Sequence, residues 1–210
     1  MNQRTQRLTL SGIMISLAVI LSFITIYKLP YGGSITLLSM VPIMLLGYLY
    51  GVGWGVLTGV IYGVLQGVLG ATMSAAFAGL DVVNVLLVCT LDYLAAFGVL
   101  GLAGIFKNKI QSVPLSFGLG VFIATTLRFA VHFVSGYIVY GSYAEWFFSQ
   151  AEVTFGQAIL TAYSGKALAA IYSLIYNATY MVPEIILSVV AGVILINIPQ
   201  IKAFSKKGAL

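Results

Sequence analysis

The sequence predicts an all-α integral membrane protein with six transmembrane helices, and three observations support that fold class. Of the 210 residues, 60% are hydrophobic and 7% are charged, whereas soluble domains carry about 25% charged residues. The mean hydropathy of the chain is +1.06. Uncharged apolar runs that are long enough to cross a bilayer as a helix, about 20 residues, recur along the sequence. These observations exclude an ordinary soluble domain.

The first three spans are predicted in the N-terminal part of the chain. Residues 8–27 form the first span, and because no small-residue cleavage site follows a short apolar core, we expect a retained helix rather than a signal peptide. A long uncharged run follows. Pro42 and the closely spaced glycines after it divide this run into two spans, at about 36–52 and 54–72, joined by a tight turn.

The last three spans are predicted at 82–106, 114–140 and 167–198, the last with a kink at Pro183. The segment 144–166, which joins the fifth and sixth spans, is too polar to cross the membrane and unusually aromatic for a linker. It predicts a short helix that lies at the outer interface, with an ordered loop that has no role in transport as the alternative. The six spans form one membrane domain over residues 1–210.

The basic residues predict that both ends of the chain are cytoplasmic. Six spans with both termini on one side bring seven Lys and Arg residues together there and leave Lys28 and Lys166 on the other side. Cytoplasmic loops carry the excess of basic residues, so this side faces inward. The seven residues are Arg4, Arg7, Lys107, Lys109, Lys202, Lys206 and Lys207. The pI of about 9.3 therefore reflects topology and anionic lipid headgroups, and no nucleic-acid partner is expected.

Ionisable groups inside the spans are the main functional signal, because each costs at least about 2.5–3.5 kcal/mol near the bilayer centre. The fourth span contains one such group, Asp92, followed by Tyr93. The fifth span has a polar face on which residues recur at intervals of four. These residues are Arg128, His132, Gly136 and Tyr140. The polar face of the sixth span is made of Ser173, Asn177, Tyr180 and Glu184, with Tyr172 and Tyr176 beside it.

Three of these residues are predicted to lie at the same depth in the membrane and so to form a candidate site. Asp92, His132 and Asn177 each lie roughly eight to ten residues from the outer end of their spans, which is about 12–15 Å at 1.5 Å per residue. Three helices thus bring a carboxylate, an imidazole and a carboxamide to one level, with tyrosines around them. Such a pocket, open to the outside, suits a small, flat, cationic molecule that can stack on the rings.

Each of these residues also has a structural interpretation. Asp92 can pair with Arg128 to hold two helices together. His132 can hydrogen-bond to a neighbouring helix, and Asn177 can serve as helix-packing glue. Glu184 lies deeper, near the midplane, where pairing with Arg128 is one hypothesis.

The sequence argues against an enzyme and against a metal protein. One cysteine and one histidine exclude disulfide frameworks and multi-histidine metal motifs. The phosphate-cradling glycine loop of ATPases is missing, as is the nucleophile turn of an intramembrane serine protease. No catalytic residue, metal or cofactor is therefore expected. If a protein with such a pocket transports its ligand, the energy must come from an ion gradient or from partner subunits.

Small residues on the first span indicate where a partner helix can approach. Gly12 and Ser16 form one small-residue pair, and Ala18 and Ser22 form another. Either pair equally fits close packing inside the six-helix bundle.

Four stretches of the sequence resemble the thiamine-specific substrate-binding (S) component of energy-coupling factor transporters. They are residues 31–51, 91–107, 128–145 and 172–184. The resemblance implies a six-helix protein of the prokaryotic plasma membrane that binds thiamine in an outward-facing pocket. It also implies a transmembrane coupling protein and two ATPase subunits as partners, with toppling of the S component in the bilayer to release the cargo.

Residue by residue, the resemblance implies a set of substrate-binding positions. They are Asp92, Tyr93, Arg128, His132, Gly136, Tyr140, Tyr172 and Asn177. The face that starts at Gly12 and Ser16 would meet the coupling protein. Some family members have Glu at the position of Asp92 and Trp at that of Tyr140, so a thiamine precursor or another vitamin is the first alternative. The second is a self-sufficient proton-coupled carrier with Glu184 and Arg128 in the proton path.

Overall fold

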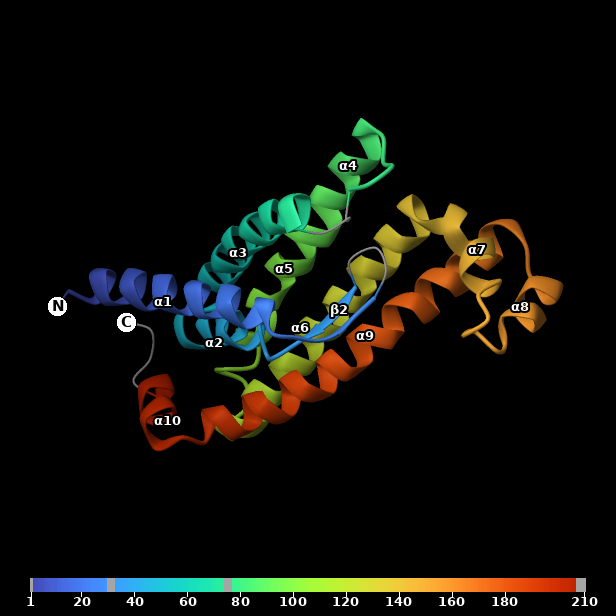
Figure 1. The fold of residues 1–210 in the computed structure, drawn as a ribbon. Coiled ribbons are helices and arrows are strands. Elements are labelled where there is room, and N and C mark those ends of the chain that lie inside the picture. Colours follow the sequence, from blue (N-terminus) through green and yellow to red (C-terminus); the bar gives the residue numbers. More distant parts are fainter. Residues whose placement is uncertain (1, 30–32, 74–76, 207–210) are drawn as a thin grey trace.

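The computed structural model describes residues 2–29, 33–73 and 77–206, and these residues form mainly a bundle of helices (Figure 1). Tyr31 and Gly32 of the resembling stretch, and Lys207 of the basic cluster, lie outside the described residues. Within them, five helices are long and apolar enough to cross a membrane. These are α1 (Gln3–Phe23), α3 (Val52–Met73), a composite helix (Val82–Gly104), α6 (Val113–Val139) and α9 (Gly165–Ile196).

The second predicted span, 36–52, is wrong in extent. Its helix, α2 (Val41–Tyr50), has ten residues, which is too short to cross a bilayer by itself. Pro42 stands in its first turn, where a missing N–H costs nothing, and Gly51 ends it with a φ of 91° that favours glycine. Nearly every residue of α2 is buried, so its uniformly apolar sequence belongs to a core helix surrounded by the others.

A β-hairpin, which the all-α prediction missed, lies between α1 and α2. β1 (Thr25–Lys28) and β2 (Ser34–Thr36) pair antiparallel. The predicted first span, 8–27, is therefore displaced: α1 begins at Gln3, where the Asn2 side chain caps it, and ends at Phe23. Isoleucine, threonine and tyrosine after Phe23 favour extended backbone, and this preference ends the helix before the expected residue.

The fourth predicted span, 82–106, is one continuous rod but not one regular helix. It consists of α4 (Val82–Val88), a π-helical turn η2 (Cys89–Ala95), α5 (Ala96–Gly98) and a 3₁₀ segment η3 (Val99–Gly104). Asp81 caps its start by accepting a hydrogen bond from the Asn84 backbone N–H at 2.8 Å. Asp92 lies in the π-helical turn, a feature that is frequent at functional sites.

Glycines let this rod pack closely on α3. A Cβ at Gly59 would collide with the carbonyl oxygen of Phe97, and one at Gly63 with that of Tyr93. Small residues that allow backbones to approach are the usual contact between membrane helices. The glycine spacing of α3 thus fixes the position of the segment that carries Asp92 and Tyr93.

The fifth and sixth predicted spans correspond closely to α6 and α9, which lie side by side (Figure 1). The segment between them holds two short helices instead of one, α7 (Ala144–Phe148) and α8 (Gly156–Ala162), after a 3₁₀ turn η4 (Gly141–Tyr143). A helix that was not predicted, α10 (Pro199–Lys206), follows α9. It lies at the end of the molecule that holds both termini, opposite α7 and α8 (Figure 1).

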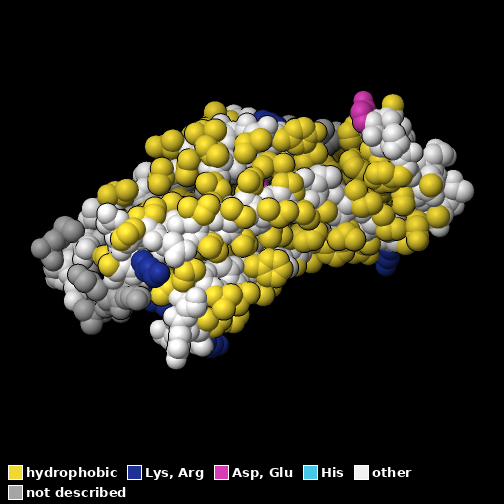
Figure 2. Space-filling model, turned by 90° about the horizontal axis from the view of Figure 1, so that it is seen from below, with side chains coloured by type: hydrophobic (Ala, Val, Ile, Leu, Met, Phe, Trp, Pro, Cys, Tyr) yellow, Lys and Arg dark blue, Asp and Glu magenta, His cyan; other side chains and the backbone are white. Residues whose placement is uncertain are grey.

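The outer surface of the bundle is largely apolar. Figure 2 shows one face covered mostly by hydrophobic side chains, with few charges. Large side chains such as Ile20 on α1, Val68 on α3, Ile138 on α6 and Ile194 on α9 are exposed. A soluble monomer rarely presents such a surface, so it matches a protein surrounded by lipid.

Candidate ligand-binding cavity

A cavity of about 390 Å³ lies between α1, the hairpin, α3, η2, α6 and α9. Its volume falls within the range of small-molecule sites, roughly 300–1,000 Å³. All eight positions that the sequence proposed for substrate binding line it: Asp92, Tyr93, Arg128, His132, Gly136, Tyr140, Tyr172 and Asn177. The predicted convergence of three helices on one pocket is therefore found in the structure.

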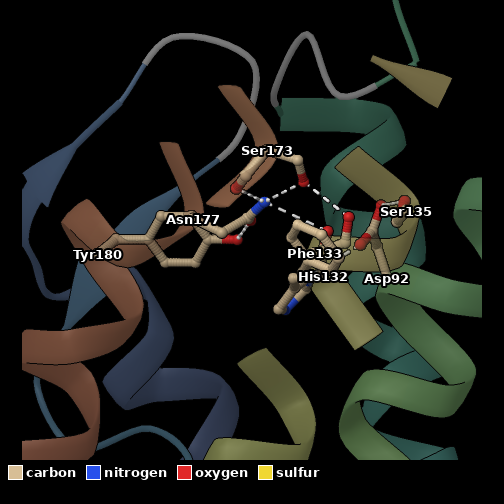
Figure 3. Close-up of polar contacts among 7 residues, drawn as sticks. All are labelled: Asp92, His132, Phe133, Ser135, Ser173, Asn177 and Tyr180. Atoms are coloured by element: carbon tan, nitrogen blue, oxygen red, sulfur yellow. Dashed lines mark hydrogen bonds and ion pairs between the residues drawn. The ribbon is translucent and has the colours of Figure 1, made fainter. Parts of the chain in front are cut away.

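Asp92 is held by two residues of α6. Its Oδ1 lies 2.7 Å from His132 Nδ1, and its Oδ2 accepts a hydrogen bond from the Ser135 hydroxyl at 2.5 Å (Figure 3). The alternative in which Asp92 pairs with Arg128 is wrong: among the described residues Asp92 forms its ion pair with His132, and the Arg128 guanidinium lies over the Phe97 ring. Sequence reasoning missed Ser135, although it stands three residues after His132 and hence on the same helix face.

Asn177 joins α9 to α6. Its amide Nδ2 donates to the His132 carbonyl oxygen at 3.2 Å and to the Ser173 carbonyl oxygen at 2.8 Å, and its Oδ1 accepts from the Tyr180 hydroxyl (Figure 3). The Ser173 hydroxyl adds a second link, donating to the Phe133 carbonyl oxygen at 2.7 Å. Asn177 therefore has the helix-packing role that the sequence left open, because it bonds α9 to α6. Its side chain also lines the cavity.

We expect Asn177→Ala to destabilise the bundle by about 1–3 kcal/mol, because the Tyr180 hydroxyl and the His132 carbonyl lose a buried partner. The midpoint of thermal unfolding in detergent measures this effect. Thr179→Ala is the matched control, since the exposed Thr179 hydroxyl donates to the Tyr176 carbonyl of its own helix and to no other described residue. Equal midpoints for the two variants would show that the interhelical bonds contribute no stability.

Several polar atoms at the cavity are left without a partner among the described residues. They include His132 Nε2, Arg128 Nε, Arg128 Nη1 and Glu184 Oε2, all buried. The hypothesis that Arg128 pairs with Glu184 is wrong: the Arg128 guanidinium lies over the Phe97 ring, 3.8 Å from its centroid, and Glu184 is bonded to Thr36. Buried polar atoms normally have partners, so these four atoms mark an unusually polar region beside the cavity.

Aromatic rings form the remaining walls. Tyr93 lies on a glycine face of α3, where a Cβ at Gly67 would be 3.4 Å from its ring, and it stacks on Phe77 at 5.7 Å between centroids. On α9, the rings of Tyr172, Tyr176 and Tyr180 follow one another at centroid distances of 5.7 Å and 6.3 Å. These rings suit a flat cation, which is attracted to the faces of aromatic rings.

A multi-pass bundle with an apolar surface, a half-buried carboxylate and an aromatic-lined cavity defines a membrane protein that captures a small polar molecule. Comparison with known proteins narrows this class. Residues 8–151 match the family model described as thiamine transporter protein, and the chain belongs to that family. Its members are transporters rather than enzymes, and the chain is a multi-pass protein of the prokaryotic plasma membrane.

Two relatives show how far the similarity extends. The thiamine transporter ThiT of Bacillus subtilis (strain 168) is 32% identical over 215 residues, which cover 96% of this chain and 97% of that protein. The solved structure of ThiT from Listeria monocytogenes superimposes with a TM-score of 0.69, covering 97% of this chain and 99% of that one. At 20% identity, the second comparison establishes a shared fold.

Proposed function

We propose that this chain binds thiamine in the cavity and acts as the substrate-capturing S component of an energy-coupling factor transporter. The observation that carries the proposal is the Asp92 carboxylate, held by His132 and Ser135 at the wall of an aromatic-lined cavity. Thiamine joins a permanently cationic thiazolium ring to a flat aminopyrimidine. Asp92 balances the positive charge, and the tyrosine rings stack on the two heterocycles.

The other lining residues supply hydrogen bonds and shape. His132 and Arg128 line the cavity, and their atoms Nε2, Nε and Nη1 have no partner among the described residues, so these two side chains bind the polar edge of the aminopyrimidine or the hydroxyethyl group. Tyr93, Tyr140 and Tyr172 form ring surfaces. Gly136 allows α9 to pack closely on α6 beside the cavity. Asn177 fixes the position of α9 relative to α6. A precursor with the same cationic or pyrimidine chemistry is the alternative ligand.

We further propose that both termini are cytoplasmic and that the α7–α8 end faces outward. The start of α1, the turn after η3 and α10 lie at the end that holds both termini (Figure 1). These segments contain Arg4, Lys107 and Lys202, in keeping with the excess of basic residues on the inner side. Lys107 also binds the end of α2, donating to the Leu49 carbonyl oxygen at 2.9 Å.

Transport by this chain requires energy from elsewhere, and reconstitution tests the source. Purified protein in liposomes should bind radiolabelled thiamine without accumulating it, even under a pH gradient, and accumulation should begin when the coupling protein and two ATPases are added with ATP. Uptake by the chain alone, driven by the pH gradient, would instead support a proton-coupled carrier. The observation that favours this alternative is that Arg128 and Glu184 have buried polar atoms without a partner among the described residues.

One of the two small-residue pairs on α1 is available to a partner. Ala18 is 0% exposed and its carbonyl oxygen accepts a hydrogen bond from Tyr62 at 3.2 Å, so that pair packs inside the bundle. Gly12 and Ser16 are exposed, and a Cβ at Gly12 meets no atom within 4 Å. We propose that the face of Gly12 and Ser16 meets the transmembrane coupling protein, because small residues allow close helix approach.

Gly12→Trp should leave thiamine binding at the wild-type level and abolish ATP-driven uptake, since an indole prevents close approach of a second helix. Co-purification with the coupling protein and uptake in reconstituted liposomes measure the two effects. Ala130→Trp, at an exposed position on α6, is the matched control and should keep both. If Gly12→Trp assembles and transports normally, the interface lies elsewhere.

A further inference from the structure

Glu184 is a buried carboxylate outside the set of residues proposed to bind thiamine. It lies in α9 one helical turn after Tyr180, and 3% of its surface is exposed. Its Oε1 accepts two hydrogen bonds from a single residue of the hairpin, from the Thr36 backbone N–H at 2.6 Å and from the Thr36 hydroxyl at 2.9 Å. A buried carboxylate is costly without such bonds, and β2 supplies both.

Thr36 stands where the chain leaves the hairpin and turns into the core. The Ser39 and Thr36 hydroxyls are 2.7 Å apart and hydrogen-bonded. The Leu37 N–H donates to the Ile24 carbonyl oxygen at 2.9 Å. Leu38 then has a φ of 60°, which is costly for a residue with a branched side chain and persists only where the surroundings hold it. Glu184 therefore anchors a tight junction between β2 and α2.

Among the described residues, the remainder of the hairpin contacts the bundle at few places. All four residues of β1 are exposed. In front of β2, Gly33 packs against Tyr180 so closely that a Cβ there would lie 2.9 Å from its ring. Yet Lys28, Ser34 and Thr36 line the cavity. The hairpin thus forms one wall of the cavity, and its contacts with Tyr180 and Glu184 determine how closely that wall approaches α9.

We propose that Glu184 is a positioning residue that holds the Thr36 end of the hairpin against α9 and so retains a bound ligand in the cavity. This inference rests on the proposed function only for the identity of the ligand, thiamine. Glu184 acts through the hairpin and not through its charge. A residue that offers an oxygen to Thr36 should therefore replace it, whereas a direct contact with a cation would require the carboxylate.

Two measurements on the purified full chain test this role. Glu184→Ala should release radiolabelled thiamine about tenfold faster or more, because the two Thr36 donors lose their acceptor. Its amide hydrogens in residues 24–28 and 34–37 should exchange faster with solvent, with the other helices unchanged. Glu184→Gln keeps an oxygen for Thr36 and should stay within about twofold of the wild-type release rate.

Ser188→Ala is the matched control. Ser188 lies one turn further along α9 with 0% exposure, and its hydroxyl has no partner among the described residues, so its loss should change neither measurement. Wild-type release and exchange in Glu184→Ala would overturn the proposal, and so would Glu184→Gln releasing thiamine as fast as Glu184→Ala. If Glu184→Ala does not fold, Thr36→Val must show the same two changes in smaller measure, because it loses the hydroxyl bonds to Glu184 and Ser39 but keeps the backbone bond to Glu184.

The two proposals fail in different ways. If the wild-type chain does not bind thiamine, the proposed function is wrong, and hydrogen exchange in the hairpin still tests the anchor without any ligand. If the wild type binds thiamine and Glu184→Ala retains it equally long, the anchor is wrong and the function stands.

Discussion

Asp92→Asn is expected to weaken thiamine binding by about 2–3 kcal/mol, or roughly 30- to 150-fold in affinity. The Asp92 side chain is 18% exposed, so its charge is only weakly screened by solvent. Asparagine cannot balance the thiazolium charge. It also turns one acceptor into a donor in a site where His132 and Ser135 both rely on Asp92 oxygens. Titration calorimetry of the purified variant measures the loss.

The control for this prediction is Asp81→Asn. Asp81 caps the start of α4 outside the cavity, and asparagine is an equally good cap, so binding should stay unchanged. Asp92→Glu retains the charge and should recover most of the affinity. Wild-type affinity in Asp92→Asn would rule out Asp92 as the counter-charge of the ligand.

Gly136→Val is expected to abolish thiamine binding. A Cβ at this position would overlap the Ser173 hydroxyl and lie 2.9 Å from Asn177 Nδ2. Because α9 is packed on α6 at this point, valine forces the two helices apart and breaks the bonds from Asn177 to His132 and from Ser173 to Phe133. Overpacking of this kind costs about 1–3 kcal/mol or more in stability, and the cavity wall moves with the helix.

Binding and thermal unfolding of Gly136→Val should be measured together. Gly53→Val is the matched control, since a Cβ at Gly53 meets no atom within 4 Å, and it should match the wild type in both. Gly136→Ala should show an intermediate loss. If Gly136→Val binds thiamine normally, the contact between α6 and α9 does not shape the cavity.

The fold was predictable where a helix is long, apolar and exposed to lipid. The boundaries of α3, α6 and α9 follow to within about two residues from length, charge and the positions of glycine and proline. The α2 segment was not predictable in the same way, because a helix that is apolar all round reads as a membrane span whether lipid or protein surrounds it. The hairpin was missed for a related reason: the first three residues of β1, 25–27, continue the uncharged run of the first span, and only their β preference distinguishes them.

The position of the candidate site was predictable from the sequence, but the hydrogen-bond partners within it were not. Spacing and depth brought Asp92, His132 and Asn177 together, as the structure does. Spacing cannot choose between equally near partners. It leaves pairing of Arg128 with Asp92 or Glu184 as open alternatives, whereas Asp92 bonds to His132 and Ser135, and Glu184 bonds to Thr36. The contacts of these two acids depend on the π-helical turn and on the hairpin, and neither feature has a sequence signal as strong as a charge in a membrane span.

Calorimetric titration of the detergent-purified chain with thiamine tests the central claim most directly. Neither Trp54 nor Trp146 is among the described residues that line the cavity, so heat is a more direct signal than tryptophan fluorescence. We expect saturable binding of one thiamine per chain that is lost in Gly136→Val and strongly weakened in Asp92→Asn. Absence of binding by the folded wild type, or binding that both variants retain in full, would contradict the account.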